Sequence, residues 1–221
     1  MRPNPQAAAR AGGAAPDTRE RILEAALQAF AEKGFDGAST REIAGRAGVP
    51  LGLIQYHFGS KQKLWQAAVD RAFGEINRGL DGSMPQALDE ESEVARMRAG
   101  IRAHVHYTAL HPEFSRLMHD EGKRRGPRMR WIVDRHVKPM FARMERMILR
   151  LQELGRIPAD IEPLHFVYAL IGAIDTVFHQ AEECRRVTGA YPRDPAFVEA
   201  HARTVEYMLL GPPDSQKERT Q

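Results

Sequence analysis

Residues 39–63, STREIAGRAGVPLGLIQYHFGSKQK, contain the side chains best suited to reading the edges of DNA base pairs. Gln55 can form two hydrogen bonds with N6 and N7 of adenine, and Leu53 can contact the methyl group of thymine. Gly52 has no side chain that would hold the backbone away from the major groove. These three residues predict a surface that prefers some base sequences over others.

A second set of groups in the same stretch suits the DNA backbone. Thr40 is expected at a helix N-terminus, where backbone N–H groups attract anions, and Lys61 places a positive charge at the start of a later helix. The Tyr56 hydroxyl and the His57 ring are further groups that can bind phosphate oxygens. We expect these four residues to set the position of the protein on the duplex.

Two short helices and a turn would hold these groups in place. Ser39 and Glu42 have the spacing of a capping box, which opens the first short helix. Pro50 fits the first turn of the second short helix, because its missing N–H would have no partner there. Ile54 and Phe58 fall on one side of that helix and are expected to anchor it inward.

The flanking residues predict a helical scaffold. Asp17 and Glu20 form another capping-box pair, and an apolar stripe at helical spacing follows until Gly34 supplies a left-handed stop. On the other side, Ser60 caps a long connecting helix that is expected to run to about Leu80. The helix-turn-helix pattern is thus predicted to lie between two longer helices.

The stretch that starts at Thr40, TREIAGRAGVPLGLIQYHFGSKQKL, resembles the DNA-binding motif of the TetR family of bacterial transcriptional regulators, and the resemblance covers residues 17–80. It implies that Thr40 and Lys61 occupy phosphate-contacting positions. It also implies a recognition-helix surface made of Leu51, Gly52, Leu53, Gln55, Tyr56 and His57. Gln55 stands where many relatives have Tyr, and Pro50 where many have Ser, so base preference and helix capping are not carried over.

Composition divides the chain into four parts. Residues 1–16 are rich in Ala, Pro, Gly and Arg and are expected to form a flexible arm, and residues 212–221 a disordered tail. Residues 17–80 are expected to form the DNA-binding domain and residues 81–211 a helical ligand-binding and dimerisation domain, which begins with an acidic run containing Gly and Pro. The predicted fold is all-α, with an N-terminal three-helix domain joined by a long helix to a C-terminal helical domain.

The C-terminal helices carry more apolar surface than one chain can bury. A long helix is predicted over residues 127–154, with a kink at Pro139. The helix that follows is apolar nearly all round, and the last one opens at Asp194. We expect residues 164–184 and 194–210 to pair with a second copy as a four-helix bundle, which makes the protein a homodimer.

Within a TetR-like fold, an effector cavity is expected among the C-terminal helices. The candidate lining residues are Ile101, His104, Tyr107, Met118, Met140, Met144, Phe166, Asp175 and Phe178. Asp175 and His104 are candidate polar anchors in an otherwise apolar set. The methionines are explained first as ordinary core residues, although their adaptable thioether side chains also suit a pocket for varied apolar molecules.

Charge and cysteine content exclude several classes of protein. The formal net charge is only +3 with a pI near 9.2, so any nucleic-acid surface must be local. Cys184 is the single cysteine, which excludes an intrachain disulfide or a Cys-based zinc cluster and predicts a small buried side chain. A secretory signal and a membrane span are both missing, so we expect a soluble cytoplasmic protein with no membrane partner.

Two rival classes remain open at this stage. Nine histidines, and Asp175 with His179 at i, i+4, would suit an enzyme that uses the C-terminal cavity. Metalloprotease, nucleophile-elbow and phosphate-loop motifs are absent, so we expect no catalytic residue, no metal and no cofactor. A helical protein-interaction module, with Tyr56 and His57 as ordinary surface residues, is the other rival. Specific binding to DNA upstream of its own gene would separate these classes from a regulator.

The residues therefore favour a ligand-responsive regulator, a repressor in preference to an activator, that binds a palindromic double-stranded DNA operator as a homodimer. Its two recognition helices would enter major grooves about 34 to 36 Å apart, or a multiple of that. A small apolar effector would re-space them through the connecting helix that carries Trp65 and Phe73, and would weaken operator binding. The basic cluster at residues 123–130 is expected to be a solvated loop and helix start.

Overall fold

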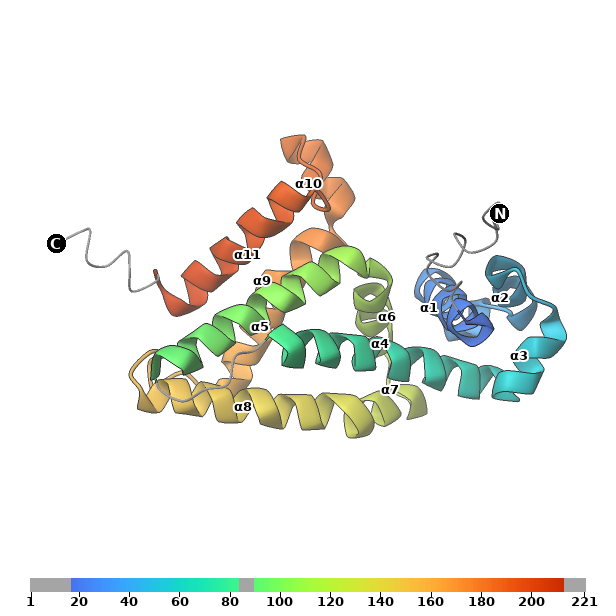
Figure 1. Ribbon diagram of the computed structural model, residues 1–221, viewed down its shortest axis with the longest axis horizontal. Helices are drawn as coiled ribbons and strands as arrows, with labels where there is room; N and C mark the ends of the chain where they lie inside the picture. The colour runs from blue at the N-terminus through green and yellow to red at the C-terminus, as the bar shows by residue number, and fades with distance from the viewer. Residues whose placement is uncertain (1–16, 84–89, 213–221) are drawn as a thin grey trace, which may run out of the picture. The chain divides into compact units, whose positions relative to one another are not determined.

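A computed structural model describes residues 17–83 and 90–212, and every regular element within these residues is helical (Figure 1). The predicted all-α fold is thus confirmed. The chain divides into two compact units, Met1–Ala68 and Val69–Gln221, with the division inside α4 (Lys61–Ser83). Composition alone predicts the boundary between the two domains at residue 81, which is later in the chain than the division between the two compact units. The predicted arm, and the tail beyond residue 212, lie outside the described residues.

The first unit is a small bundle around one apolar core. Its helices are α1 (Thr18–Gly37), α2 (Thr40–Ala47), α3 (Leu51–Phe58) and the start of α4. The largest fully buried side chains of this unit are Ile22, Leu23, Ile43, Leu64 and Trp65. α2 packs against both α1 and α3, so the two short helices share one scaffold.

The chain turns sharply at Gly34 within α1. Gly34 has φ of 69°, a left-handed value that glycine adopts without steric cost, and the predicted stop at this residue is confirmed. Helical geometry then resumes for a short segment up to Gly37. The turn places the Phe35 ring 5.8 Å from that of Phe30 and 6.3 Å, edge-on, from that of Trp65. These ring contacts tie the end of α1 to the start of α4.

In the first unit two of the predicted helix caps form, one does not, and Pro50 lies one position earlier than predicted. The Ser39 hydroxyl accepts a hydrogen bond from the Glu42 N–H at 3.1 Å, and the Ser60 hydroxyl accepts one from the Lys63 N–H at 3.2 Å. The exposed Asp17 carboxylate makes no cap hydrogen bond, so the capping box predicted there is wrong. Pro50 precedes α3 as its N-cap and does not lie in the first turn, because its ψ of 138° is still extended.

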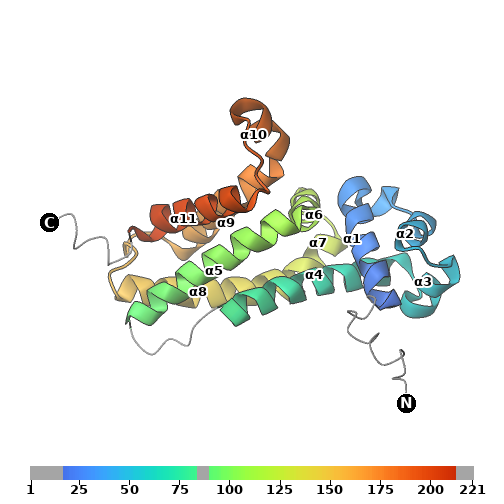
Figure 2. The same ribbon diagram turned by 45° about the horizontal axis from the view of Figure 1, so that its top comes forward.

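The second unit is built around α5, which packs against four other helices, α6, α8, α9 and α11, and lies between α8 and α11 in Figure 2. After the remainder of α4, the elements are α5 (Glu90–Leu110), α6 (Pro112–Gly122), α7 (Pro127–Ile132), η2 (Val133–Val137), α8 (Lys138–Glu153), α9 (Pro163–His179), α10 (Ala181–Thr188) and α11 (Pro195–Leu210). None of the helices in the described part of the chain has the length and apolarity to cross a membrane.

The long helix predicted over residues 127–154 is interrupted by one π-helical turn, η2. The Lys138 N–H bonds to the carbonyl of Val133, and Pro139 then falls in the first turn of α8, where its missing N–H costs little. Within this turn the His136 ring stacks on Phe73 of α4 at 4.3 Å. Arg135 also donates to the Asp70 carboxylate at 2.6 Å. Both contacts join the π-helical turn to the part of α4 that belongs to the second unit.

α9 has one buried side and one exposed side. The sequence makes this helix apolar nearly all round, but in the structure Phe178 is buried whereas Tyr168 is 65% exposed. At about 100° per residue, Phe178 lies closer in angle to the buried Ile174 than to Tyr168, which explains the difference. The exposed side also includes Leu164, which is 45% exposed.

The C-terminal end of the unit follows the sequence prediction with three corrections. α11 begins after Asp194 as predicted and buries Val198, Ala202 and Val205, although the Asp194 side chain makes no cap hydrogen bond. The sequence pattern missed α10 as a separate helix. Cys184 lies on α10 and is only half-buried, so its prediction as a fully buried side chain is wrong.

We predict that Ser39→Ala lowers the free energy of unfolding by about 1 kcal/mol, because it removes the oxygen that binds the Glu42 N–H. Urea denaturation at neutral pH would measure this loss. The matched control is Asp17→Ala, an N-cap residue without a side-chain cap bond, which should cost no more than about 0.5 kcal/mol. Equal losses in the two variants would contradict the assignment of the Ser39 cap.

Candidate nucleic-acid interface

α3 is anchored by one side and exposes the other. Ile54 and Phe58 are buried, at 3% and 7% exposure, which places the predicted anchor residues inside the first unit. Tyr56 is 81% exposed, although its ring meets that of the neighbouring His57 edge-on at 5.1 Å. The other predicted contact residues that are exposed are Leu51, Gly52, Gln55 and His57. Leu53 is half-buried, so only part of its side chain is available to a base.

The turn before α3 fixes the direction of this exposed side. Gly48 adopts φ of 64°, and the buried Val49 then donates its N–H to the Ala44 carbonyl at 3.0 Å. The Leu53 N–H bonds to the Pro50 carbonyl at 3.0 Å, which starts α3. A side chain at Gly48 would be strained by its backbone conformation, so glycine is required at the turn.

Gly52 differs from Gly48, because nothing crowds it. A Cβ added at Gly52 would meet no atom within 4 Å, and the backbone there is ordinary helix. The fold of the isolated chain therefore gives no reason for a glycine inside α3, where glycine is less favourable than alanine. Close approach of another molecule to the backbone would provide such a reason.

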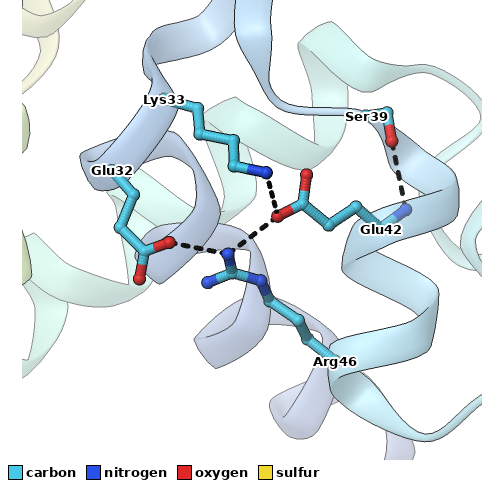
Figure 3. Close-up of polar contacts among 5 residues, drawn as sticks. All are labelled: Glu32, Lys33, Ser39, Glu42 and Arg46. Atoms are coloured by element: carbon cyan, nitrogen blue, oxygen red, sulfur yellow. Dashed lines mark hydrogen bonds and ion pairs between the residues drawn. The ribbon is translucent and has the colours of Figure 1, made fainter.

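An ion-pair cluster joins α1 to α2, the helix that leads into the Gly48 turn (Figure 3). Arg46 donates to Glu32 at 2.6 Å and to Glu42 at 2.7 Å, while Lys33 lies 2.8 Å from the Glu42 carboxylate. Hydrogen bonds from Arg46 lower the pKa of Glu32, and those from Lys33 and then Arg46 lower the pKa of Glu42. The Glu42 carboxylate, which belongs to the capping-box pair, is thus ion-paired with Lys33 and Arg46. Sequence reasoning missed this cluster, although Glu42 and Arg46 have i, i+4 spacing.

The two predicted phosphate-contacting residues differ in their surroundings. Thr40 opens α2 and is half-buried. The Lys61 ammonium donates to the Asp36 carbonyl at 3.3 Å and lies 4.7 Å from the centre of the Phe35 ring. Lys61 is thereby held against the segment after Gly34 in the absence of a ligand, and a phosphate would have to compete with these weak contacts.

The second unit contains a small apolar cavity of about 50 Å³. Its lining residues are Leu80, Met97, Gly100, Ile101, His104, Met140, Arg143, Met144, Met147, Leu170, Ile171 and Ile174. Ile101, His104, Met140 and Met144 are thus brought together from the predicted set. The volume is close to that of one or two water molecules, far below the roughly 300 Å³ at which ligand pockets begin.

The other predicted ligand residues lie elsewhere in the second unit. The Tyr107 hydroxyl donates to the Ala72 carbonyl at 3.0 Å, and Phe166 and Phe178 belong to the packed core. Met118 is half-buried on α6. Asp175 lies beside the cavity rather than on its wall.

A polar group of three residues adjoins the cavity through His104. Asp175 accepts a hydrogen bond from the Thr108 hydroxyl at 3.2 Å, and the same oxygen lies 3.9 Å from His104 Nε2. Burial lowers the pKa of His104, with Asp175 acting in the opposite direction. His179 points away from this group and stacks on His119 at 4.5 Å, so the i, i+4 pair seen in the sequence does not converge. Among the described residues no three candidate ligands come close enough to hold a metal ion.

A three-helix unit with a short exposed helix after a glycine turn, followed by an all-helical unit with an apolar cavity, defines a helix-turn-helix protein of two parts. The comparisons with known proteins agree with this class. The family model of bacterial regulatory proteins of the tetR family matches residues 22–68, and the tetracyclin repressor-like C-terminal domain matches residues 94–208. The chain belongs to the TetR family and is a helix-turn-helix transcriptional regulator.

Individual relatives are distant but span most of the chain. The regulator RutR of Escherichia coli K12 is 24% identical over 195 residues, which cover 87% of this chain and 88% of RutR. The repressor AcnR of Corynebacterium efficiens is 29% identical, covering 67% of this chain and 74% of AcnR. The solved structure of the fatty acid degradation regulator FadR from Bacillus halodurans has a TM-score of 0.66 at 18% identity, covering 88% of this chain and 98% of FadR.

We predict that the ion-pair cluster makes stability depend on pH below 4.5. Because the pKa values of Glu32 and Glu42 are lowered from 4.5, the cluster stabilises the folded state above that pH and is lost as the pH falls through the lowered values. Arg46→Gln should therefore flatten the decline of unfolding free energy with acidification. Urea denaturation at a series of pH values from 7 downward would measure the slopes.

The control for this experiment is Arg41→Gln, which removes a positive charge from the exposed side of the same helix but leaves the cluster intact. Its slope should match that of the unmodified protein. Identical slopes for the unmodified protein and Arg46→Gln would show that the cluster does not hold the two carboxylates ionised.

Proposed function

We propose that this regulator is a repressor that binds a palindromic operator as a homodimer and is released by a small, largely apolar effector. The single observation that supports operator binding best is the exposed side of α3, which is fixed from below by Ile54 and Phe58. On this side Gly52, Leu53 and Gln55 would contact base edges, and Gln55 suits adenine. A helix presented in this way is the geometry that enters a major groove.

Phosphate contacts would flank the base contacts. We assign them to Thr40 and Lys61, with the exposed Tyr56 and His57 as further donors and Leu51 at the edge of the surface. Lys61 would exchange its contact with the Asp36 carbonyl for a phosphate oxygen. Because the Asp36 carbonyl is an uncharged acceptor and the contact is long, at 3.3 Å, an anionic acceptor would be the stronger partner.

Dimerisation through α9 and α11 is supported by exposed apolar surface in the second unit. The exposed large apolar residues on α9, α10 and α11 are Leu164, Tyr168, Val187, Tyr207 and Met208. A groove of about 440 Å³ runs between these helices and contains Val177, Cys184 and Met208. Apolar surface gathered in this way favours a protein partner, and a second copy of the chain would give the two-fold symmetry that a palindrome requires.

The effector would bind at the apolar cavity of the second unit. At about 50 Å³ the cavity is too small for an organic ligand, so binding would require its methionines to move. Leu80, near the end of α4, lies on the cavity wall, and α4 is the helix that runs from the first unit into the second. An effector that favours another position of α4 would thereby change operator affinity, and a coupling of about 1 to 3 kcal/mol would be sufficient.

The proposed DNA surface predicts that Gly52→Ala separates folding from function. Alanine should stabilise α3 by about 0.5 to 1 kcal/mol, because the added Cβ meets no atom, but it should weaken operator binding by at least tenfold by blocking backbone approach. Footprinting and gel-shift titration on DNA upstream of the protein's own gene would measure the binding. The absence of any specific footprint there would contradict the proposal that this protein is a repressor.

Gly45→Ala is the matched control, because it makes the same change on the exposed side of α2, again with no atom within 4 Å. It should stabilise the unit to a similar extent and leave operator affinity unchanged. If both variants bind as well as the unmodified protein, Gly52 lies outside the interface.

The proposed dimer predicts that Tyr168→Asp combined with Met208→Asp converts the protein into a monomer. The two charges would have to be buried against the partner, which costs several kcal/mol and should weaken dimerisation more than a hundredfold. Analytical ultracentrifugation at micromolar concentration would measure the mass. Leu149→Asp, on the 45% exposed Leu149 of α8, is the control that should remain dimeric. A dimer that survives the double substitution would place the interface elsewhere.

A further inference from the structure

A basic recess adjoins the apolar cavity of the second unit. It has a volume of about 370 Å³ and is lined by Asp81, Glu93, Arg96, Arg143, Arg146, Met147 and Arg150. Arg143 and Met147 also line the apolar cavity, so these two side chains form the wall between the two spaces. A molecule that displaced this wall would occupy both spaces at once.

Among the described side chains that line the recess, positively charged groups outnumber negatively charged ones. Four arginines line it, against the two carboxylates of Asp81 and Glu93. Arg143 is paired with Asp81 at 2.8 Å, and Arg150 donates to Glu153, which lies outside the recess, also at 2.8 Å. Both pairs are largely exposed, so an anion of the same charge can replace a carboxylate at little cost.

Arg96 provides a second, independent sign of a ligand. Its Nε atom is buried and has no hydrogen-bond partner among the side chains that the structure describes. A buried donor that lacks an acceptor costs free energy, and native proteins satisfy nearly all such groups. An acidic group in the recess would supply the missing acceptor.

The part of the apolar cavity next to His104 does not suit an anion. The Asp175 side chain lies beside this part of the cavity and accepts a hydrogen bond from the Thr108 hydroxyl at 3.2 Å. Burial lowers the pKa of His104, which lies on the cavity wall, and so disfavours a positive charge that could attract an anion. An acidic ligand would therefore be oriented, with its charge at the arginines and its apolar part toward His104.

We propose that the effector of this regulator is an amphipathic organic anion, an apolar chain with a carboxylate or phosphate head, whose head binds Arg96, Arg143 and Arg146 and whose chain fills the cavity between α5, α8 and α9. This inference rests on the effector-released repressor proposed above and names the chemical class of its ligand. The flexible side chains of Met140, Met144 and Met147 would move to admit the chain.

The test uses decanoate, the neutral 1-decanol and the cationic decylamine as probes, each titrated into the full-length protein below its aggregation concentration. Isothermal titration calorimetry should give decanoate a dissociation constant at least tenfold lower than that of either other probe. Shortening decanoate to octanoate should weaken binding about fourfold per methylene removed. Equal affinities of decanoate and 1-decanol would overturn the proposal.

The decanoyl thioester of coenzyme A distinguishes the two possible heads, because its acidic groups are phosphates. Tighter binding of the thioester than of decanoate would assign the recess to a phosphate head, and the reverse would assign it to a carboxylate. Failure of all these anions to bind would overturn the ligand class.

Arg96→Gln combined with Arg146→Gln should weaken binding of the preferred anion at least tenfold, because charged hydrogen bonds are lost. Arg130→Gln, an exposed arginine of α7 outside the recess, is the control for net charge and should bind normally. If circular dichroism shows that the double variant is unfolded, Arg146→Gln alone is tested instead. The Arg146 side chain is exposed, so its replacement should affect stability little. Unchanged affinity in the variant that folds would remove the arginines from the site.

A gel shift with and without the bound anion keeps the two proposals apart. Binding that requires the arginines but leaves operator affinity unchanged would support the ligand class and contradict release by an effector. Specific operator binding without affinity for any of the anions would support the proposed repressor and overturn only the proposed class of ligand.

Discussion

The burial of Ile54 and Phe58 is the constraint on which the proposed DNA surface depends. A helix of eight residues has little stability by itself, so tertiary packing must supply both its formation and its orientation. Two side chains one turn apart fix one face, and the left-handed Gly48 fixes where the helix starts. The exposed side of α3 is thus determined indirectly, by what its opposite side contacts.

Local signals in the sequence predicted the first unit well. The left-handed glycine at Gly34 and the Ser39 and Ser60 caps depend on a few neighbouring residues, and all three form as predicted. The Asp17 cap failed because a permissive residue at the right spacing does not oblige its side chain to bind. The cluster around Arg46 needed a contact between α1 and α2, which spacing along one helix cannot reveal.

The second unit was predicted less completely, because its details depend on packing between distant helices. Apolar periodicity identified α9 and α11 but could not distinguish apolar residues that line a cavity from those that fill the core. Phe166 and Phe178 were therefore assigned to a ligand site although they pack in the core. Leu80, Gly100 and Met147 of the cavity wall, and the arginine recess beside it, went unnoticed for the same reason.

The π-helical turn η2 also bears on how this sequence can be compared with others. A π turn holds one residue more than an α turn while the helix on either side continues. Loss of a single residue within Val133–Val137 would restore regular α geometry and keep α7 and α8 in phase. An alignment gap of one residue is therefore best placed here, whereas the same gap inside α8 would rotate its cavity-lining methionines by about 100°.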